Sequence, residues 1–117
     1  MDSSELRIER GNVYLPAEVY ERFFAGLTSV ALLIREGQLL LLPVHSQAFG
    51  GLIIKVLNAR GDRVIQAQEF FRQYLSEDQP LLTCQYTWSS QWSGLLLQHP
   101  GLSQAFDPSW SPSEPPG

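Results

Sequence analysis

The feature that most constrains the fold is the stretch from Gly11 to Phe24, followed by two apolar runs at 29–34 and 39–44. A residue before proline is pushed towards extended geometry, so Leu15 should end a strand. The fixed φ of Pro16 suits the first position of a helix. Helical spacing then puts apolar side chains on one face: Val19, Tyr20, Phe23, Phe24 and Leu27. The pattern predicts a loosely alternating strand, interrupted at Gly11-Asn12, and then a short helix.

The two apolar runs have the character of a hairpin. Residues 29–34 read SVALLI, which is too continuously apolar for a strand with one wet face, so we expect cover on both sides. Glu36-Gly37 is a good two-residue turn, because glycine adopts the positive φ that such turns require. The returning strand, 38–44, contains Pro43, which cannot donate to a ladder and so indicates a sheet edge or exit.

A second strand pair is predicted at 52–57 and 63–67, joined by a five-residue connection. Residues 68–75 then switch to helical spacing, with Phe70 and Phe71 among the apolar positions. The region 81–102 is harder to read, because its first part alternates like a strand while Trp88, Trp92, Leu95 and Leu96 also fit one helical face. We expect the first part to be a strand.

These elements predict one small β-rich α+β domain over residues 1–102, a barrel or sheet of hairpins with a short helix after the first strand and another near 68–75. Residues 103–117 are rich in Pro and Ser, so we expect a flexible tail there.

The amino-acid composition bears on the kind of partner and on the location that we expect. The net charge is −4 with eight Lys plus Arg among 117 residues, which disfavours broad electrostatic binding to nucleic acid. We expect a cytoplasmic location for three reasons. The chain has a single cysteine, its beginning shows no apolar leader, and its apolar runs are too short to cross a bilayer.

The run RGNVYLPAEVYERFF, then Gly26-Leu27, SVALLI, a tight turn and QLLLLPV resembles the AbrB/MraZ-like swapped-hairpin family over Arg7 to Pro43. The positions that match the family pattern are Gly11, Val13, Leu15, Pro16, Glu18, Val19, Arg22 and Phe23.

This resemblance implies a β-rich barrel formed by two chains that exchange hairpins, often used to bind DNA through arginines near the first strand. Arg7 and Arg10 stand at such positions, and Arg35 is a further candidate for DNA contact. The chain departs from DNA-binding members because Glu5, Glu9, Glu18 and Glu21 are interspersed among these arginines.

Catalytic and metal chemistry find little support. Cys84 with His45 or His99 could form a thiol and base pair, but a lone cysteine is more often a small buried hydrophobe. Two histidines without paired carboxylates do not make a zinc set. We therefore expect no catalytic residue, no metal and no cofactor.

Other motifs have simple structural explanations. Glu18 and Glu21 fit a solvated helix face better than paired acids, and Phe49-Gly50-Gly51 fits a loop better than a phosphate cradle. Arg60-Gly61-Asp62 fits a hairpin turn, although Arg60 and Arg63 beside it could contact an acidic partner or a phosphate.

Tryptophan and phenylalanine are enriched at interface anchor points, which makes Trp88, Trp92, Phe106 and Trp110 candidates for partner binding. The favoured function is a non-enzymatic interaction protein, an accessory or adaptor factor that forms a homodimer and recruits a protein partner. The alternative is an AbrB-like DNA-binding transcriptional regulator.

Overall fold

The computed structural model describes residues 5–44, 51–74 and 81–99. Eight strands and two short helices follow one another along these residues: β1 (Glu5–Glu9), β2 (Asn12–Leu15), α1 (Ala17–Phe23), β3 (Ser29–Arg35), β4 (Gln38–Pro43), β5 (Leu52–Val56), β6 (Arg63–Gln66), α2 (Gln68–Arg72), β7 (Leu82–Ser89) and β8 (Gly94–Gln98). Neither helix among these residues has the length and apolar character that a membrane-spanning helix requires.

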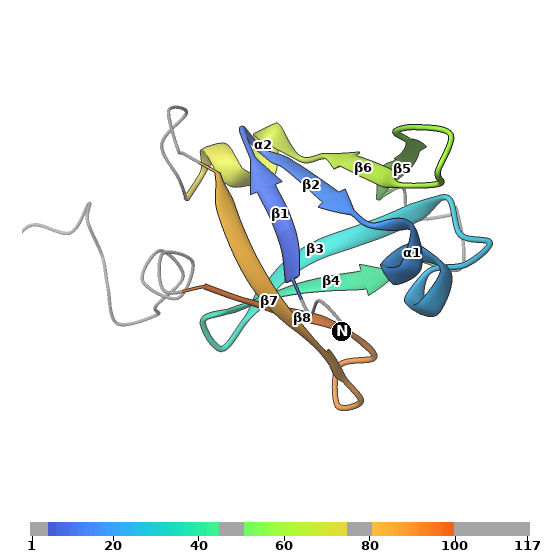
Figure 1. Cartoon of the computed structure of the whole chain (residues 1–117). Coiled ribbons are helices and arrows are strands. Elements are labelled where there is room, and N and C mark those ends of the chain that lie inside the picture. The colour runs from blue at the N-terminus through green and yellow to red at the C-terminus, as the bar shows by residue number, and fades with distance from the viewer. Residues whose placement is uncertain (1–4, 45–50, 75–80, 100–117) are drawn as a thin grey trace, which may run out of the picture.

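The eight strands close into one barrel in the order β1-β2-β6-β5-β3-β4-β8-β7 (Figure 1). Every neighbouring pair is antiparallel, and β1 pairs with β7 to complete the circle. The prediction of a β-rich fold with a small barrel is therefore confirmed. The domain boundary at residue 102 and the tail at 103–117 lie outside the described residues.

Alternation along each strand fills the barrel interior. In β1, for example, Leu6 and Ile8 are buried, whereas Glu5 and Arg7 are exposed. Every strand contributes at least one buried side chain to one continuous core, which also takes Val19 and Tyr20 from α1 and Phe71 from α2. The period of two in these sequences is what turns one face of each strand inward.

The first strand of the sequence reading is two strands in the structure. Arg10 and Gly11 form a tight turn between β1 and β2, with φ values of 53° and 80°. The predicted turn at Glu36-Gly37 has the same character, with φ values of 53° and 76°. A reversal at Arg10-Gly11 explains the interruption that the alternating pattern showed there.

The expectation of a strand in the first part of 81–102 is confirmed over the described residues 81–99. Residues 82–89 and 94–98 form the hairpin β7–β8, in which Trp88 pairs with Leu95. The alternative helical spacing does not correspond to a helix over residues 81–99. The expectation that 29–34 is covered on both sides fits the outward-facing Ala31 and Leu33, which are half-buried.

The helices lie at opposite ends of β2, and so at opposite ends of the barrel (Figure 1). α1 follows the end of β2 through Pro16. α2 packs against the beginning of β2, where Gln68 Nε2 donates to Asn12 Oδ1 at 2.8 Å and Ala67 N donates to Gly11 O at 2.8 Å. This packing brings Gln68 close to the backbone of Gly11.

We expect Gly11→Ala to destabilise the fold more than Gly26→Ala. The two glycines have nearly the same φ, 80° and 79°, but a Cβ on Gly11 would lie 2.8 Å from the Gln68 Cα while a Cβ on Gly26 would meet nothing within 4 Å. Gly26→Ala should cost about 1 kcal/mol of unfolding free energy from the backbone alone, and Gly11→Ala clearly more. Urea unfolding measures both, and equal losses would contradict the close packing of α2.

Candidate functional site

A cavity of about 350 Å³ opens on the barrel wall where β1 and β2 meet the β5–β6 connection. We call it the arginine groove. Its lining residues are Glu5, Leu6, Arg7, Tyr14, Leu15, Pro16, Leu57, Asn58, Arg60, Asp62, Arg63 and Thr83. The lining thus includes three arginines and two acidic residues, on a chain whose net charge is −4.

Two of the three arginines rest on aromatic rings. The guanidinium carbon of Arg7 lies 4.1 Å from the centre of the Tyr14 ring, and that of Arg63 lies 4.2 Å from the centre of the Tyr20 ring. Within the described residues neither arginine has a carboxylate partner. A guanidinium held by its flat face keeps the N–H donors of its edge available to an anion.

The register of the strands sets the first of these contacts. Arg7 and Tyr14 are directly opposite one another in the β1–β2 hairpin, and Thr83 lies opposite Arg7 on β7. All three therefore share the outer face of the barrel. Tyr20 is itself fixed, because its hydroxyl donates to the Leu27 carbonyl at 2.8 Å.

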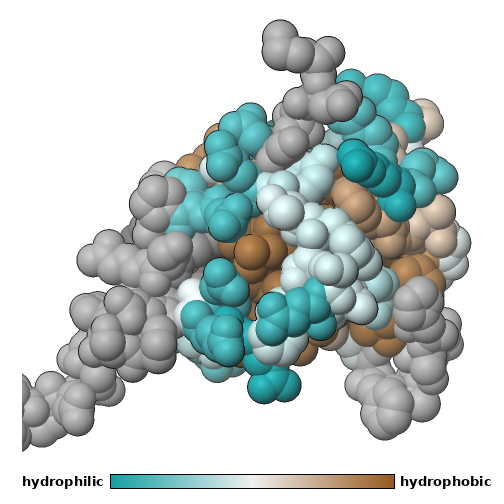
Figure 2. Space-filling view, turned by 90° about the horizontal axis from the view of Figure 1, so that it is seen from below, coloured by the Kyte–Doolittle hydropathy of each residue, from teal (hydrophilic) through white to brown (hydrophobic). Residues whose placement is uncertain are grey.

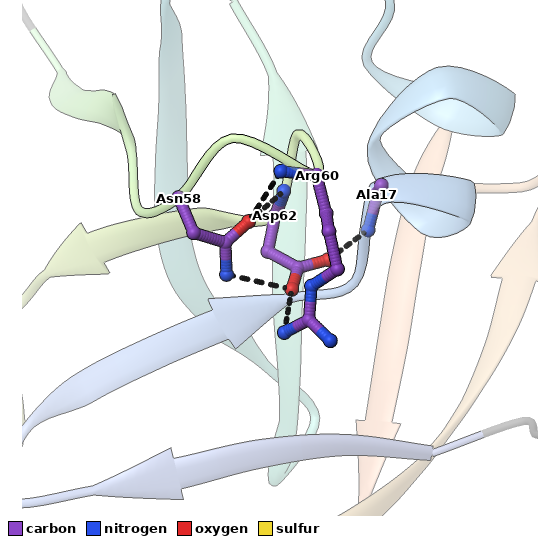
Figure 3. Close-up of polar contacts among 4 residues, drawn as sticks. All are labelled: Ala17, Asn58, Arg60 and Asp62. Atoms are coloured by element: carbon purple, nitrogen blue, oxygen red, sulfur yellow. Dashed lines mark hydrogen bonds and ion pairs between the residues drawn. The ribbon is translucent and has the colours of Figure 1, made fainter.

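The third arginine belongs to a hydrogen-bonded loop that closes one side of the groove (Figure 3). Asp62 Oδ2 accepts from Asn58 Nδ2 at 2.9 Å and from Arg60 at 3.0 Å. Asn58 Oδ1 accepts from the backbone N–H groups of Arg60 and Asp62 at 3.0 and 3.3 Å. The Arg60 side chain nevertheless remains 82% exposed, so it reaches solvent from a fixed base.

Asp62 also joins this loop to α1. Its Oδ1 accepts from the backbone N–H of Ala17 at 2.8 Å, a contact 45 positions apart in sequence (Figure 3). Ala17 is the first residue of the helix, so Asp62 supplies the N-terminal acceptor that Pro16 cannot provide. Hydrogen bonds from Asn58 and Ala17, with the nearby Arg60 charge, hold the pKa of Asp62 below its usual value.

The groove unites residues that the sequence had placed in two separate groups. Arg7 was a candidate for DNA contact, and Arg60 and Arg63 were candidates for a protein partner. Arg10 and Arg35 do not join them. Both are exposed in or beside turns at the opposite end of the barrel, where α2 lies.

The described tryptophans both contact other parts of the chain. Trp88 is 39% exposed and stacks on Phe23 of α1, with ring centres 5.4 Å apart and planes 5° apart. Trp92 is half-buried, and the Arg35 guanidinium carbon lies 6.0 Å from its ring centre. Phe106 and Trp110 lie outside the described residues.

Cys84 lies in the core, whereas Glu18 and Glu21 lie on the surface. Cys84 is fully buried in the core, where burial raises its pKa to about 11, so its thiol stays protonated at neutral pH. Glu18 and Glu21 are exposed on α1. Over the part of the chain that the structure describes, no three His, Cys, Asp or Glu side chains gather as a metal site would require. His45, Phe49 and Gly50 are not among the described residues.

Sequence reasoning missed Tyr14, Asn58 and Leu57 as parts of the groove. Alternation along β2 was a usable signal for Tyr14, because an aromatic residue between the inward Val13 and Leu15 must face outward. Asn58 and Asp62 are typical turn residues, but only the tertiary fold brings their loop to α1.

Comparison with known proteins adds no family. No family model matches the chain, and neither curated proteins nor solved structures give a match.

We expect Asp62→Asn to lower stability at neutral pH and to reduce its dependence on acid. The pKa of Asp62 is lowered in the folded state, so the carboxylate stabilises the fold above about pH 4, the ordinary value for Asp, and this contribution is lost as the pH falls through the lowered pKa. Thermal melts from pH 7 to pH 2 should show the two proteins converging in acid. The exposed Glu21→Gln is the control, and parallel curves at every pH would contradict the role of Asp62.

Proposed function

We propose that this protein is a non-enzymatic interaction factor that binds an acidic segment of a protein partner in the arginine groove. The observation that carries the proposal is the pair of guanidinium groups, Arg7 and Arg63, held on aromatic faces without carboxylate partners among the described residues. Such groups are already oriented and lose little freedom when they take up an anion.

The fixed loop adds to this support. Asp62 and Asn58 hold the base of Arg60 in place, and residues from β1, β2, β6, β7 and the β5–β6 connection line the groove. A cavity of about 350 Å³ is near the lower end of small-ligand pockets, ~300 Å³, and one peptide side chain with its neighbours fits such a space. Exchange of hairpins between two chains stays a prediction from the family resemblance.

Replacing Arg7 and Arg63 together by glutamine should remove partner binding while the fold survives. Full-length tagged protein would capture partners from nuclease-treated lysate of its native host. A protein retained by the wild type and by the Arg22→Gln control, but lost from the double variant, is the expected result. Arg22 is a fair control because its guanidinium carbon also lies over a ring, 5.0 Å from the centre of Phe23, and does not line the groove.

The captured protein should carry the determinant in an acidic segment. Changing its Asp and Glu to Asn and Gln should weaken binding about tenfold or more, which corresponds to ~1.4 kcal/mol, and raised salt should weaken the unaltered pair. Equal retention by the wild type and the Arg7→Gln, Arg63→Gln double variant would refute the proposal.

A second candidate is an AbrB-like DNA-binding regulator. In its favour, Arg10 and Arg35 are both exposed at the α2 end of the barrel, on opposite walls. Affinity for DNA should then fall steeply with salt as phosphates release counterions. The Arg7→Ala, Arg10→Ala double variant should bind DNA more weakly than the wild type in electrophoretic mobility shift assays. Unchanged affinity of the double variant for every DNA tested would contradict DNA binding through these residues. The single variant Arg10→Ala should still bind the acidic protein partner, because Arg10 does not line the groove.

A further inference from the structure

The sequence after β8 carries acidic side chains and no basic ones. Residues 100–117, here called segment 100–117, contain Asp107 and Glu114 but no Lys, Arg or His. Such a sequence complements an arginine that lacks an acidic neighbour in contact with it, and Arg7 in the groove has no carboxylate partner among the described residues. The charge of segment 100–117 therefore makes it a candidate ligand for the groove of its own chain.

β8 ends two strands away from the groove. Gln98, its last residue, pairs with Gln85 of β7, and Gln85 pairs with Glu5 of β1, which lines the groove. Neighbouring strands are about 5 Å apart, so Gln98 lies about 10 Å from Glu5. β8 runs along the lower side of the molecule in Figure 1, and the view from that side shows hydrophilic side chains around an apolar centre (Figure 2).

The direction of β8 leads towards the level of Arg7. Because β7 and β8 are antiparallel, the chain leaves Gln98 in the direction that runs from Gln85 to Thr83 along β7. Thr83 pairs with Arg7 and lines the groove. Gln85 and Thr83 are exposed and uncharged, so they do not repel an acidic side chain that crosses β7. Glu5, two residues before Arg7 and on the same face, is the group that opposes it.

Chain length favours Asp107 over Glu114 as the residue that reaches Arg7. Asp107 lies nine residues beyond Gln98, and Glu114 lies sixteen residues beyond it. Chains of these lengths span on average ~16 Å and ~22 Å. The shorter length is closer to the separation between β8 and β1, and the effective concentration of a tethered group falls as its tether grows beyond the distance to be spanned.

We propose that the carboxylate of Asp107 binds the N–H edge of Arg7 in the arginine groove of its own chain, until the acidic segment of a protein partner displaces it. This rests on the proposed function and adds a regulation of the same site. A group on a short tether has an effective concentration in the millimolar range. The partner is therefore bound more weakly than it would be by an empty groove.

A fluorescein-labelled peptide with the sequence of residues 103–113 tests this proposal, with fluorescence anisotropy against the full-length protein as the readout. The Asp107→Asn variant, whose own segment no longer competes, should bind the peptide about tenfold more tightly than the wild type. This factor corresponds to a segment affinity of about 0.1 mM at an effective concentration of ~1 mM. Glu114→Gln removes the other acidic side chain of segment 100–117 and is the matched control, which should behave as the wild type does.

Variants of the groove show where the peptide binds. Arg7→Gln added to Asp107→Asn should abolish the gain in affinity, whereas Arg22→Gln added to it should not, because Arg22 is exposed on α1 and does not line the groove. Glu5→Gln added to Asp107→Asn should strengthen binding, since it removes the carboxylate that opposes Asp107. Circular dichroism melts of each variant confirm that the fold is retained.

The outcomes separate this inference from the proposed function. Equal affinity of the peptide for the wild type and the Asp107→Asn variant overturns the inference, and so does an absence of binding or binding that survives Arg7→Gln. A wild-type affinity that falls as the protein concentration rises also overturns it, because a second copy would then supply the segment. Equal capture of the lysate partner by the Arg7→Gln, Arg63→Gln variant overturns the proposed function, and with it the displacement by a partner, even where the peptide results place Asp107 on Arg7.

Discussion

The pairing of β1 with β7 is the constraint on which the rest of the structure depends. It joins the beginning of the described chain to its last hairpin and turns an open sheet into a barrel without edges. Leu6 and Ile8 meet Cys84 and Leu82 across this seam, all of them buried. Because Arg7 lies between Leu6 and Ile8, the apolar pairs that close the barrel also fix an arginine on its outer wall.

The second constraint is the carboxylate of Asp62. An N-terminal proline leaves a helix without a side-chain cap of its own, and α1 has none. Asp62 supplies the acceptor from a distant loop and accepts from Arg60 with its other oxygen. This side chain therefore helps to position α1 and Arg60, while the backbone carbonyl of the same residue accepts from the Leu57 N–H. Changes at Asp62 should act on the groove and on stability together.

Local patterns predicted the parts of this fold better than their assembly. Glu36-Gly37 marked a turn because glycine tolerates positive φ, and alternation at 52–57 and 63–67 marked a strand pair that the structure contains. In the region after residue 80 a helical period competed with the strand alternation that we favoured for its first part, and the pairing of β7 with β1 and β8 shows strands over the described residues. Cross-strand register supplies information that spacing along one chain does not carry.

The residues of the candidate site could likewise be noted singly from the sequence, but their arrangement could not. Arg60 and Arg63 could be noted from sequence because they flank a turn, and Arg7 because it stands on the first strand. Their convergence depends on β2 lying between β1 and β6 in the barrel, an order that sequence does not give. Tyr14 was visible as an outward residue but had no known neighbour until the register placed Arg7 opposite it.

The manner in which the arginines are held explains how an acidic chain can keep a cationic groove. Charges on exposed surfaces are screened beyond about 8 Å at physiological salt, so the net charge of −4 matters less inside the groove than the groups that line it. A carboxylate placed beside Arg7 or Arg63 would compete with any incoming anion for the same donors. An aromatic ring orients a guanidinium without using its N–H groups, and Tyr14 and Tyr20 do this for Arg7 and Arg63. The contrast with Arg60, which gives one donor to Asp62, separates the arginine that fixes the loop from the two whose edges remain for a ligand.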